Sequence, residues 1–366
     1  MKNGRTLEQL AAELTRRANA ARDFITDTRE LTLLPDPSGT FALRLGAGGE
    51  AFGVTDHTHR QVGGRLDIPA KYYDRMRQEQ PGLLAYNVNT WFRSKPERRM
   101  VRTLDGSARA FLSDRYRRLD NYELAEAVLP QLFDAGAEVQ SCEVTDSKVY
   151  IKAVTPRVEG EVKTGDVVRA GIMVSNSEVG AGALVIQPLL YRLVCLNGMV
   201  RPVSEGMGLR RAHLGGSYED ADGYQELYSD EALEADDKAF WLKTRDIVRA
   251  VLSPRTLEAQ LAPLREATTV TLADPVAAVQ ELGKRMPTLT LGEQGGILQH
   301  LIRDADFTHY GLVNAITRHA QDVESYDRSV GLEELGSTVL SLPKRDLSAI
   351  LQARMGNDAQ PVLVGA

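Results

Sequence analysis

The sequence has 366 residues, of which 43% are hydrophobic and 26% charged, and its formal net charge is −6. These values exclude a wholly disordered chain. No apolar run approaches the roughly 20 residues that a bilayer requires, so no membrane-spanning helix is predicted. The first residues contain no apolar signal core, and we therefore expect a cytoplasmic protein. The length suits two domains, or one domain with a large extension.

The N-terminal part is predicted to mix helices and strands. Apolar residues recur at spacings of three and four over residues 6–25, which indicates an amphipathic helix. Short strands bounded by turns rich in proline and glycine are expected at 31–34, 41–45 and 51–54. Helices should follow at 56–63, 70–80 and 83–93. Asp56 is the expected N-cap of the first of these.

The central part is predicted to form an antiparallel sheet. Residues 100–104 and 108–112 flank Asp105-Gly106, which is a strong hairpin signal. A helix over 122–133 should end just before Gly136, where a left-handed C-cap is expected. Further strands are predicted at 138–145, 148–154, 167–175 and 183–195. The order of hairpin, helix and meander favours one antiparallel sheet backed by helices over a doubly wound parallel sheet.

The C-terminal part is predicted to be helical. Helical patterns dominate from Tyr224 onward and are interrupted at Pro254, Pro275, Pro287 and Pro343. The fold class is therefore α+β, with an antiparallel β-sheet and packed helices in the N-terminal and central part, followed by an all-helical C-terminal part. We divide the chain into an α+β core domain (1–200), a Gly-rich linker loop (201–223) and a helical domain (224–366).

Positive charge is concentrated between Trp91 and Arg118, where nine Lys or Arg and three acids occur. Arginine suits phosphate oxygens, and a cationic groove with aromatic platforms binds single-stranded nucleic acid without reading its sequence. We therefore predict a nucleic-acid-binding surface. Its residues are Arg93, Lys95, Arg98, Arg99, Arg102, Arg109, Arg115, Tyr116, Arg117 and Arg118. The alternative is a solvated surface paired with the acidic segment 217–248.

No complete catalytic or metal-binding signature is found. His57-Thr58-His59 has the spacing of a metal pair on a strand, but it stands at a predicted helix start, which favours a polar helix terminus. Cys142 and Cys195 are expected to be reduced and shielded. Residues 175–178, Ser-Asn-Ser-Glu, form either a ligand-contacting loop or a hairpin tip. We expect no catalytic residue, no metal and no cofactor.

The acidic segment leaves a metal-dependent nuclease as a third hypothesis, because clustered carboxylates can hold two metal ions. Their density is more typical of a solvated helix face and loop. The carboxylates concerned are Glu219, Asp220, Asp222, Glu226, Asp230, Glu231, Glu234, Asp236 and Asp237.

Four segments resemble motifs of the phage- and plasmid-borne proteins grouped as domain of unknown function 932. They read HRQVGGRLDIPAKYYDRM (59–76), RAFLSDRYRRLDN (109–121), SNSEVGAGALVIQPLLYRLVCLNGM (175–199) and YGLVNAIT (310–317). The resemblance implies a role in DNA metabolism but no particular activity. The order of elements is also similar to the core of single-strand annealing proteins of the Rad52 type, which is a likeness of topology alone.

The leading hypothesis is a non-enzymatic, single-stranded-DNA-binding protein of phage or plasmid type that anneals strands as a homo-oligomer. Annealing requires a groove for backbone phosphates and needs neither nucleophile nor metal, so the absence of a catalytic motif agrees with it. The alternative is an accessory or anti-defence protein that acts through protein contacts of its acidic helical part.

Overall fold

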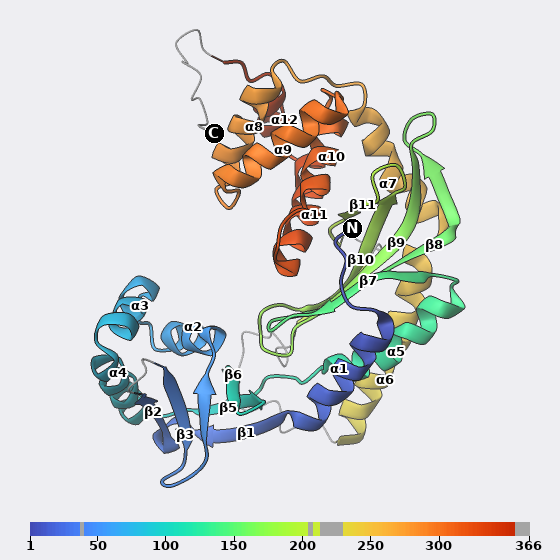
Figure 1. The fold of residues 1–366 in the computed structure, drawn as a ribbon. Coiled ribbons are helices and arrows are strands. Elements are labelled where there is room, and N and C mark those ends of the chain that lie inside the picture. Colours follow the sequence, from blue (N-terminus) through green and yellow to red (C-terminus); the bar gives the residue numbers. More distant parts are fainter. Residues whose placement is uncertain (37–39, 204–207, 213–229, 356–366) are drawn as a thin grey trace.

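The computed structural model describes residues 1–366 except 37–39, 204–207, 213–229 and 356–366. The chain forms a crescent (Figure 1). A first sheet and its helices make one end, a second sheet lies in the middle, and the C-terminal helices make the other end. None of the described helices is long and apolar enough to cross a membrane.

The first sheet has six strands in the order β1-β5-β6-β4-β3-β2. Neighbours run antiparallel, except that β4 and β6 are parallel. The strands are β1 (Arg22–Asp27), β2 (Leu31–Pro35), β3 (Phe41–Leu45), β4 (Ala51–Val54), β5 (Arg98–Leu104) and β6 (Ser107–Ser113). The predicted helix over 6–25 is wrong at its end, because residues from Arg22 onward pair with β5. Local periodicity cannot reveal a pairing partner so distant in sequence.

Helices cover one face of this sheet. They are α2 (Asp56–Arg65), α3 (Ala70–Glu79) and α4 (Pro81–Ser94), and the short helix η1 (Thr28–Glu30) joins β1 to β2. Their apolar residues Val62, Tyr73 and Leu84 meet Phe41 and Phe52 of the sheet in one buried cluster. Burial of such side chains removes about 25 cal/mol of unfavourable hydration per Å². Thr55, rather than the predicted Asp56, caps α2.

The second sheet has the strand order β11-β10-β9-β8-β7, and β12 also pairs with β10. All its pairs are antiparallel. The strands are β7 (Glu138–Val144), β8 (Val149–Glu161), β9 (Val167–Asn176), β10 (Leu184–Arg192), β11 (Asn197–Val200) and β12 (Leu209–Arg211). The prediction that the 100–112 hairpin shares this sheet is wrong, because β5 and β6 pair with β1 and β4.

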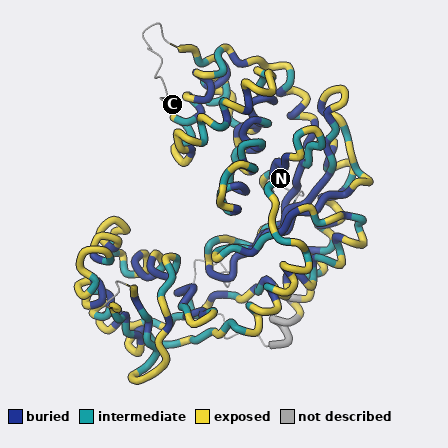
Figure 2. The backbone as a smooth tube through the Cα atoms, in the orientation of Figure 1, coloured by how far each residue is buried: buried dark blue, intermediate teal, exposed yellow. Residues whose placement is uncertain are grey.

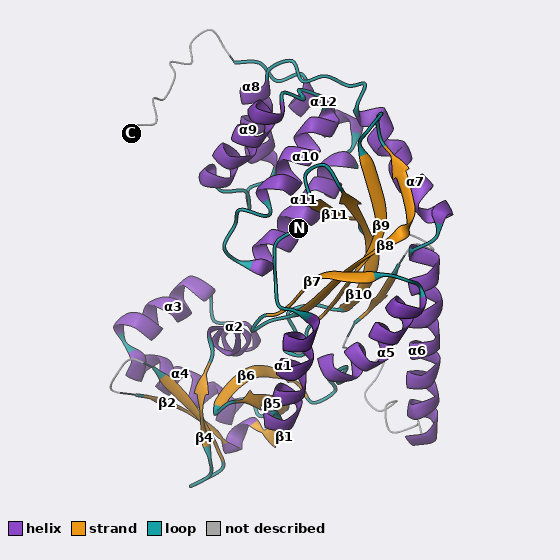
Figure 3. Ribbon diagram, turned by 45° about the vertical axis from the view of Figure 1, so that its right-hand side comes forward, coloured by secondary structure: helices purple, strands orange, loops and turns teal. Residues whose placement is uncertain are grey.

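Three helices pack on the second sheet at the outside of the crescent (Figure 3). They are α1 (Leu7–Ala20), α5 (Asn121–Asp134) and α6 (Asp230–Val251). A capping box between Thr6 and Gln9 begins α1. Gly136 follows α5 with a φ of +69°, as the expected left-handed C-cap requires. Figure 2 shows that the strands of this sheet form the most continuously buried part of the chain.

The C-terminal part is helical, as predicted, and the α+β class is confirmed. Its helices are α7 (Pro254–Ala267), α8 (Pro275–Arg285), α9 (Leu291–Asp304), α10 (His309–His319), α11 (Tyr326–Leu340) and α12 (Lys344–Leu351). Their core also contains Val168 and Leu190 of the second sheet. A fully buried ion pair joins Lys152 of β8 to Glu333 of α11. The domain division stays a prediction.

Candidate nucleic-acid interface

The predicted basic surface is built on the hairpin of β5 and β6. Arg102 pairs with Ala110 in the middle of the two strands, whereas Arg99 pairs with Ser113 at the open end of the hairpin. The two positions have different surroundings. The middle of the hairpin faces a loop of the second sheet, and the open end lies at the surface beside the end of α4.

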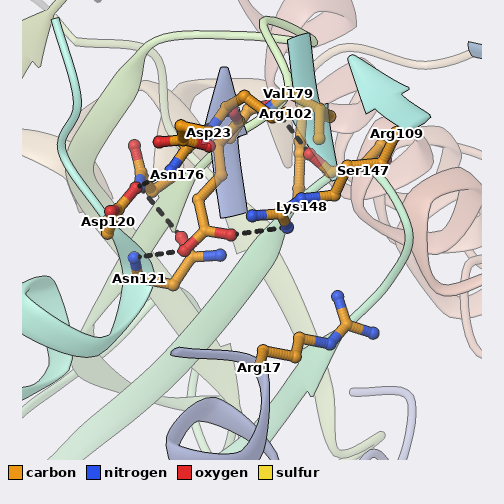
Figure 4. A network of polar contacts seen from close by, with 12 residues as sticks. Arg17, Asp23, Arg102, Arg109, Asp120, Asn121, Ser147, Lys148, Asn176 and Val179 are labelled. Carbon is orange, nitrogen blue, oxygen red and sulfur yellow. Dashed lines mark hydrogen bonds and ion pairs between the residues drawn. The ribbon is translucent and has the colours of Figure 1, made fainter. Parts of the chain in front are cut away.

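Arg102 is the most enclosed of the predicted cations, with 2% of its surface exposed. Its Nε donates to Asp23 Oδ1 at 2.8 Å, and its Nη2 donates to Asp120 Oδ1 at 2.8 Å. Its Nη1 donates to the Glu178 carbonyl at 3.0 Å (Figure 4). Burial opposes the charged form, but the carboxylates of Asp120 and Asp23 prevail and raise the pKa of Arg102. The guanidinium is therefore charged, and each of its three nitrogens donates a hydrogen bond.

The Glu178 carboxylate organises the other side of this network. One oxygen accepts a 2.7 Å hydrogen bond from Arg109 Nη1. Arg109, like Arg102, is a buried residue. The other carboxylate oxygen accepts the backbone N–H of Asn121 at 2.7 Å, at the N-terminus of α5. A carboxylate at this position complements the positive end of the helix dipole. Asn176 adds a bond from its Nδ2 to the Leu119 carbonyl at 2.7 Å.

Residues 175–182, here called the junction loop, comprise the end of β9 and most of the turn to β10, and they contact the first sheet and α2. The carbonyl of Val179 accepts a 2.8 Å bond from Gln61 Nε2 and lies 2.8 Å from His57 Nε2, both on α2. The phenol of Tyr116 donates to the Ser177 carbonyl at 2.9 Å. Gly180 has a φ of +76°, and a Cβ there would lie 2.6 Å from Leu112. The sequence predicts that residues 175–178 form either a ligand-contacting loop or a hairpin tip. Their hydrogen bonds are made to other residues of the protein, which favours the hairpin tip.

The structure divides the predicted surface. Arg102, Arg109 and Tyr116 are buried and bonded to protein groups, so they present little surface to a ligand, and their contact with nucleic acid stays a prediction. The physical reason is that a buried cation must be paired, and carboxylates distant in sequence supply the pairs. Arg99 is half-buried, pairs with Glu97 at 3.1 Å and lies 5.1 Å from the Phe111 ring centroid.

Two more of the predicted cations have partners. Arg118 is exposed but lies 3.5 Å from Asp23, the carboxylate that also binds Arg102. Arg117 is half-buried and has an interaction of its own.

Four other predicted cations are exposed and appear in no described ion pair, and we call them the outer cluster: Arg93, Lys95, Arg98 and Arg115. None of the described carboxylates forms an ion pair with them. Two acids close to them in sequence or strand pairing have other partners: Glu97 binds Arg65 and Arg99, and Asp27 binds Arg29. Lys95 Nζ lies 5.0 Å from the ring centroid of Trp91, which is 39% exposed. The exposed indole therefore lies beside a cation without an ion-pair partner among the described residues, near the end of α4.

A second cationic feature, not anticipated from the sequence, lies on the second sheet. A groove of about 490 Å³ runs between this sheet and α11, and Lys148 and Arg210 contribute cations to it. Arg211 stacks 4.2 Å from the Phe240 ring on the α6 side. Its neighbour Arg210 therefore projects from the opposite face, since successive strand residues alternate. Lys148 and Arg210 belong to distant segments, so no local pattern could have joined them.

The remaining candidates have structural roles where they are described. His57 and His59 lie on α2, not on a strand, and His59 Nδ1 contacts the Tyr73 hydroxyl at 2.8 Å. Cys142 and Cys195 are both free thiols, as predicted. Cys142 is buried, and burial raises its pKa to about 11. Cys195 is only half-buried, because it lies in the turn after β10 instead of within the predicted strand.

The acids of the nuclease hypothesis cannot be placed together. Four of them, Glu219, Asp220, Asp222 and Glu226, lie outside the described residues. The other five belong to the start of α6, whose side chains there are likewise outside the description.

The fold defines an α+β protein with two sheets that are joined by a buried polar junction. A family model described as domain of unknown function 932 matches residues 110–340. The chain belongs to this family. The match contains the junction loop and the second sheet but begins after Arg93, Lys95 and Arg98, which are three of the four residues of the outer cluster. Searches among curated proteins and among solved structures found no match.

Proposed function

We propose that the protein binds single-stranded nucleic acid, and DNA in particular, at the outer cluster. The observation that carries this proposal is that the four cations of the outer cluster are exposed without described carboxylates to neutralise them, and that one of them, Lys95, lies beside the exposed ring of Trp91. Free cations can follow the phosphates of a strand, while an indole face offers a stacking platform for bases. This combination is sequence-tolerant, because every base has a π face and every nucleotide has a phosphate.

Strand annealing by a homo-oligomer is the activity that such a surface would serve. Annealing needs backbone contacts that leave the base edges free to pair. Contacts from surface cations to phosphates leave those edges unoccupied.

The test is a salt series with a labelled single-stranded oligonucleotide, followed by fluorescence anisotropy. Each phosphate neutralised on a single strand contributes about −0.7 to the slope of log affinity against log salt, so four contacts predict about −2.8. Replacing all four residues of the outer cluster by alanine should remove most of this slope. Affinity at 0.15 M salt should fall on the order of 100-fold.

A matched control separates this local effect from the change in net charge. The variant with Lys71, Arg249, Arg255 and Arg345 replaced by alanine loses the same number of exposed cations from other parts of the surface. It should bind almost as the parent does. Parental affinity and slope in the outer-cluster variant would refute the proposal. Loss of binding in a variant lacking Lys148 and Arg210 instead would move the interface to the groove.

A further inference from the structure

One side-chain cluster at the C-terminal end of the crescent has the composition of a metal site. Among the described residues, His300, His319 and Asp322 form a group whose potential ligand atoms all lie within 4.8 Å of one another. His300 Nε2 is 2.5 Å from Asp322 Oδ2, and His319 Nδ1 is 3.7 Å from the same oxygen. The three residues come from α9, from the last residue of α10 and from the turn that follows it.

The local structure fixes these three residues. The backbone N–H of Asp322 donates to the His319 carbonyl at 2.9 Å, so the turn holds the carboxylate beside the ring. A Cβ at Gly296 would lie 2.3 Å from His319 Cε1, and only glycine lets the ring lie against α9. Glycine in a helix interior is unfavourable, so its use here indicates that the position of the ring matters.

The cluster leaves bonding capacity unused. His319 Nδ1 is buried and has no hydrogen-bond partner among the described residues. An unsatisfied buried polar atom is costly and rare in folded proteins. Asp322 is half-exposed, with 51% of its side chain accessible, so an ion and a water molecule can reach the group from solvent.

Arg303 is the obstacle in the metal-free arrangement. Its Nη2 donates to His300 Nδ1 at 2.7 Å, which places the single ring proton on Nε2, where it is donated to Asp322. For Nε2 to bind a metal, this proton must move to Nδ1 and Arg303 must turn away. The Arg303 side chain is 57% exposed and can do so. The ring stays neutral, so the exchange releases no net proton.

We propose that His300 Nε2, His319 Nδ1 and an Asp322 carboxylate oxygen bind one Zn²⁺ ion, with water as the fourth ligand. Two imidazoles and one carboxylate are ligands that this ion accepts in a tetrahedral arrangement. The ion would tie α9 to the turn between α10 and α11. The site is independent of the proposed nucleic-acid interface, because it shares no residue with it.

The experiment is calorimetric titration of the untagged full-length protein with Zn²⁺ after treatment with a chelator. One equivalent should bind. Replacing His300 or His319 by glutamine, or Asp322 by asparagine, should each weaken binding by more than the roughly 10–100-fold expected for loss of a second-shell partner. Glu324→Gln is the matched control, since it removes an exposed carboxylate two residues from Asp322 that forms no ion pair with a described residue, and it should leave binding unchanged.

Two further measurements keep the proposal falsifiable if a variant folds poorly. Arg303→Ala should bind Zn²⁺ more tightly than the parent, because the competing donor is gone. Zn²⁺ should also raise the melting temperature of the parent and of Glu324→Gln but not that of Asp322→Asn. Absence of binding in the parent, or equal binding in the parent and all three ligand variants, would overturn the site.

Discussion

Cations between Trp91 and Arg118 lie in two different environments. Arg102 and Arg109 sit beneath the junction loop, where Asp23, Asp120 and Glu178 neutralise and bond them. The outer cluster is exposed at the open end of the same hairpin and has no such partners in the described structure. A dense run of arginines thus combines cations that hold the protein together with cations that are free to bind something else. Mutation of the first group should lower the free energy of unfolding, whereas mutation of the outer cluster should lower the affinity for nucleic acid.

The largest effect is expected at Arg102. Methionine in its place would keep the length of the side chain but remove the guanidinium that binds Asp120 and Asp23, and Asp23 would retain only its 3.5 Å contact with Arg118. Breaking a buried ion pair in this way costs about 3–5 kcal/mol of unfolding free energy. Urea denaturation followed by circular dichroism measures this loss. Arg98→Met is the control from the outer cluster and should stay within about 0.5 kcal/mol of the parent. Similar stabilities for the two variants would contradict the distinction between the buried, paired cations and the outer cluster.

Acid should have the next largest effect, through His59 of α2. Burial lowers the pKa of His59 from 6.5 to about 4, so the folded state binds this proton less readily than the unfolded state. The resulting stability is complete above pH 6.5 and is lost as the pH falls toward 4, by at most about 3 kcal/mol. Unfolding curves at several pH values should show this decline. His59→Gln should flatten it, and an unchanged slope in that variant would contradict the assignment.

Replacing Trp91 tests binding at the outer cluster without changing the charge of that surface. If bases stack on the exposed indole, Trp91→Ala should reduce affinity for single strands by about 1–3 kcal/mol. The salt slope should remain that of the parent, since no phosphate contact is lost. Anisotropy titrations at several salt concentrations separate the two quantities. A loss of slope with this variant would mean that its effect on binding is indirect.

Arg115→Ala should give the smallest change. This exposed residue has no ion-pair partner among the described residues, so unfolding free energy should move by less than about 0.5 kcal/mol. The salt slope of binding should flatten by about 0.7, the value for one phosphate contact. A large loss of stability would instead place Arg115 with the inner cations.

The sequence by itself determined the local structure of most elements. Alternation, turn residues and caps predict the hairpin at Asp105-Gly106 and the end of α5 before Gly136, and they predict breaks at Pro254 and Pro275, where the structure begins α7 and α8. These signals lie within a few residues of the features that they specify. Motif resemblance likewise pointed to the family that the match at 110–340 establishes.

Only the tertiary structure decided which cations are exposed. Asp23 and Glu178 are 79 and 76 residues from Arg102, and no local rule brings them together. The same holds for the division into two sheets, because strand pairing joins segments such as β1 and β5 across three intervening strands and three α-helices. It holds again for His300 and Asp322, which helix packing alone makes neighbours. Charge and hydrogen bonding act over a few ångströms of space, and the distance along the chain does not determine which groups come that close.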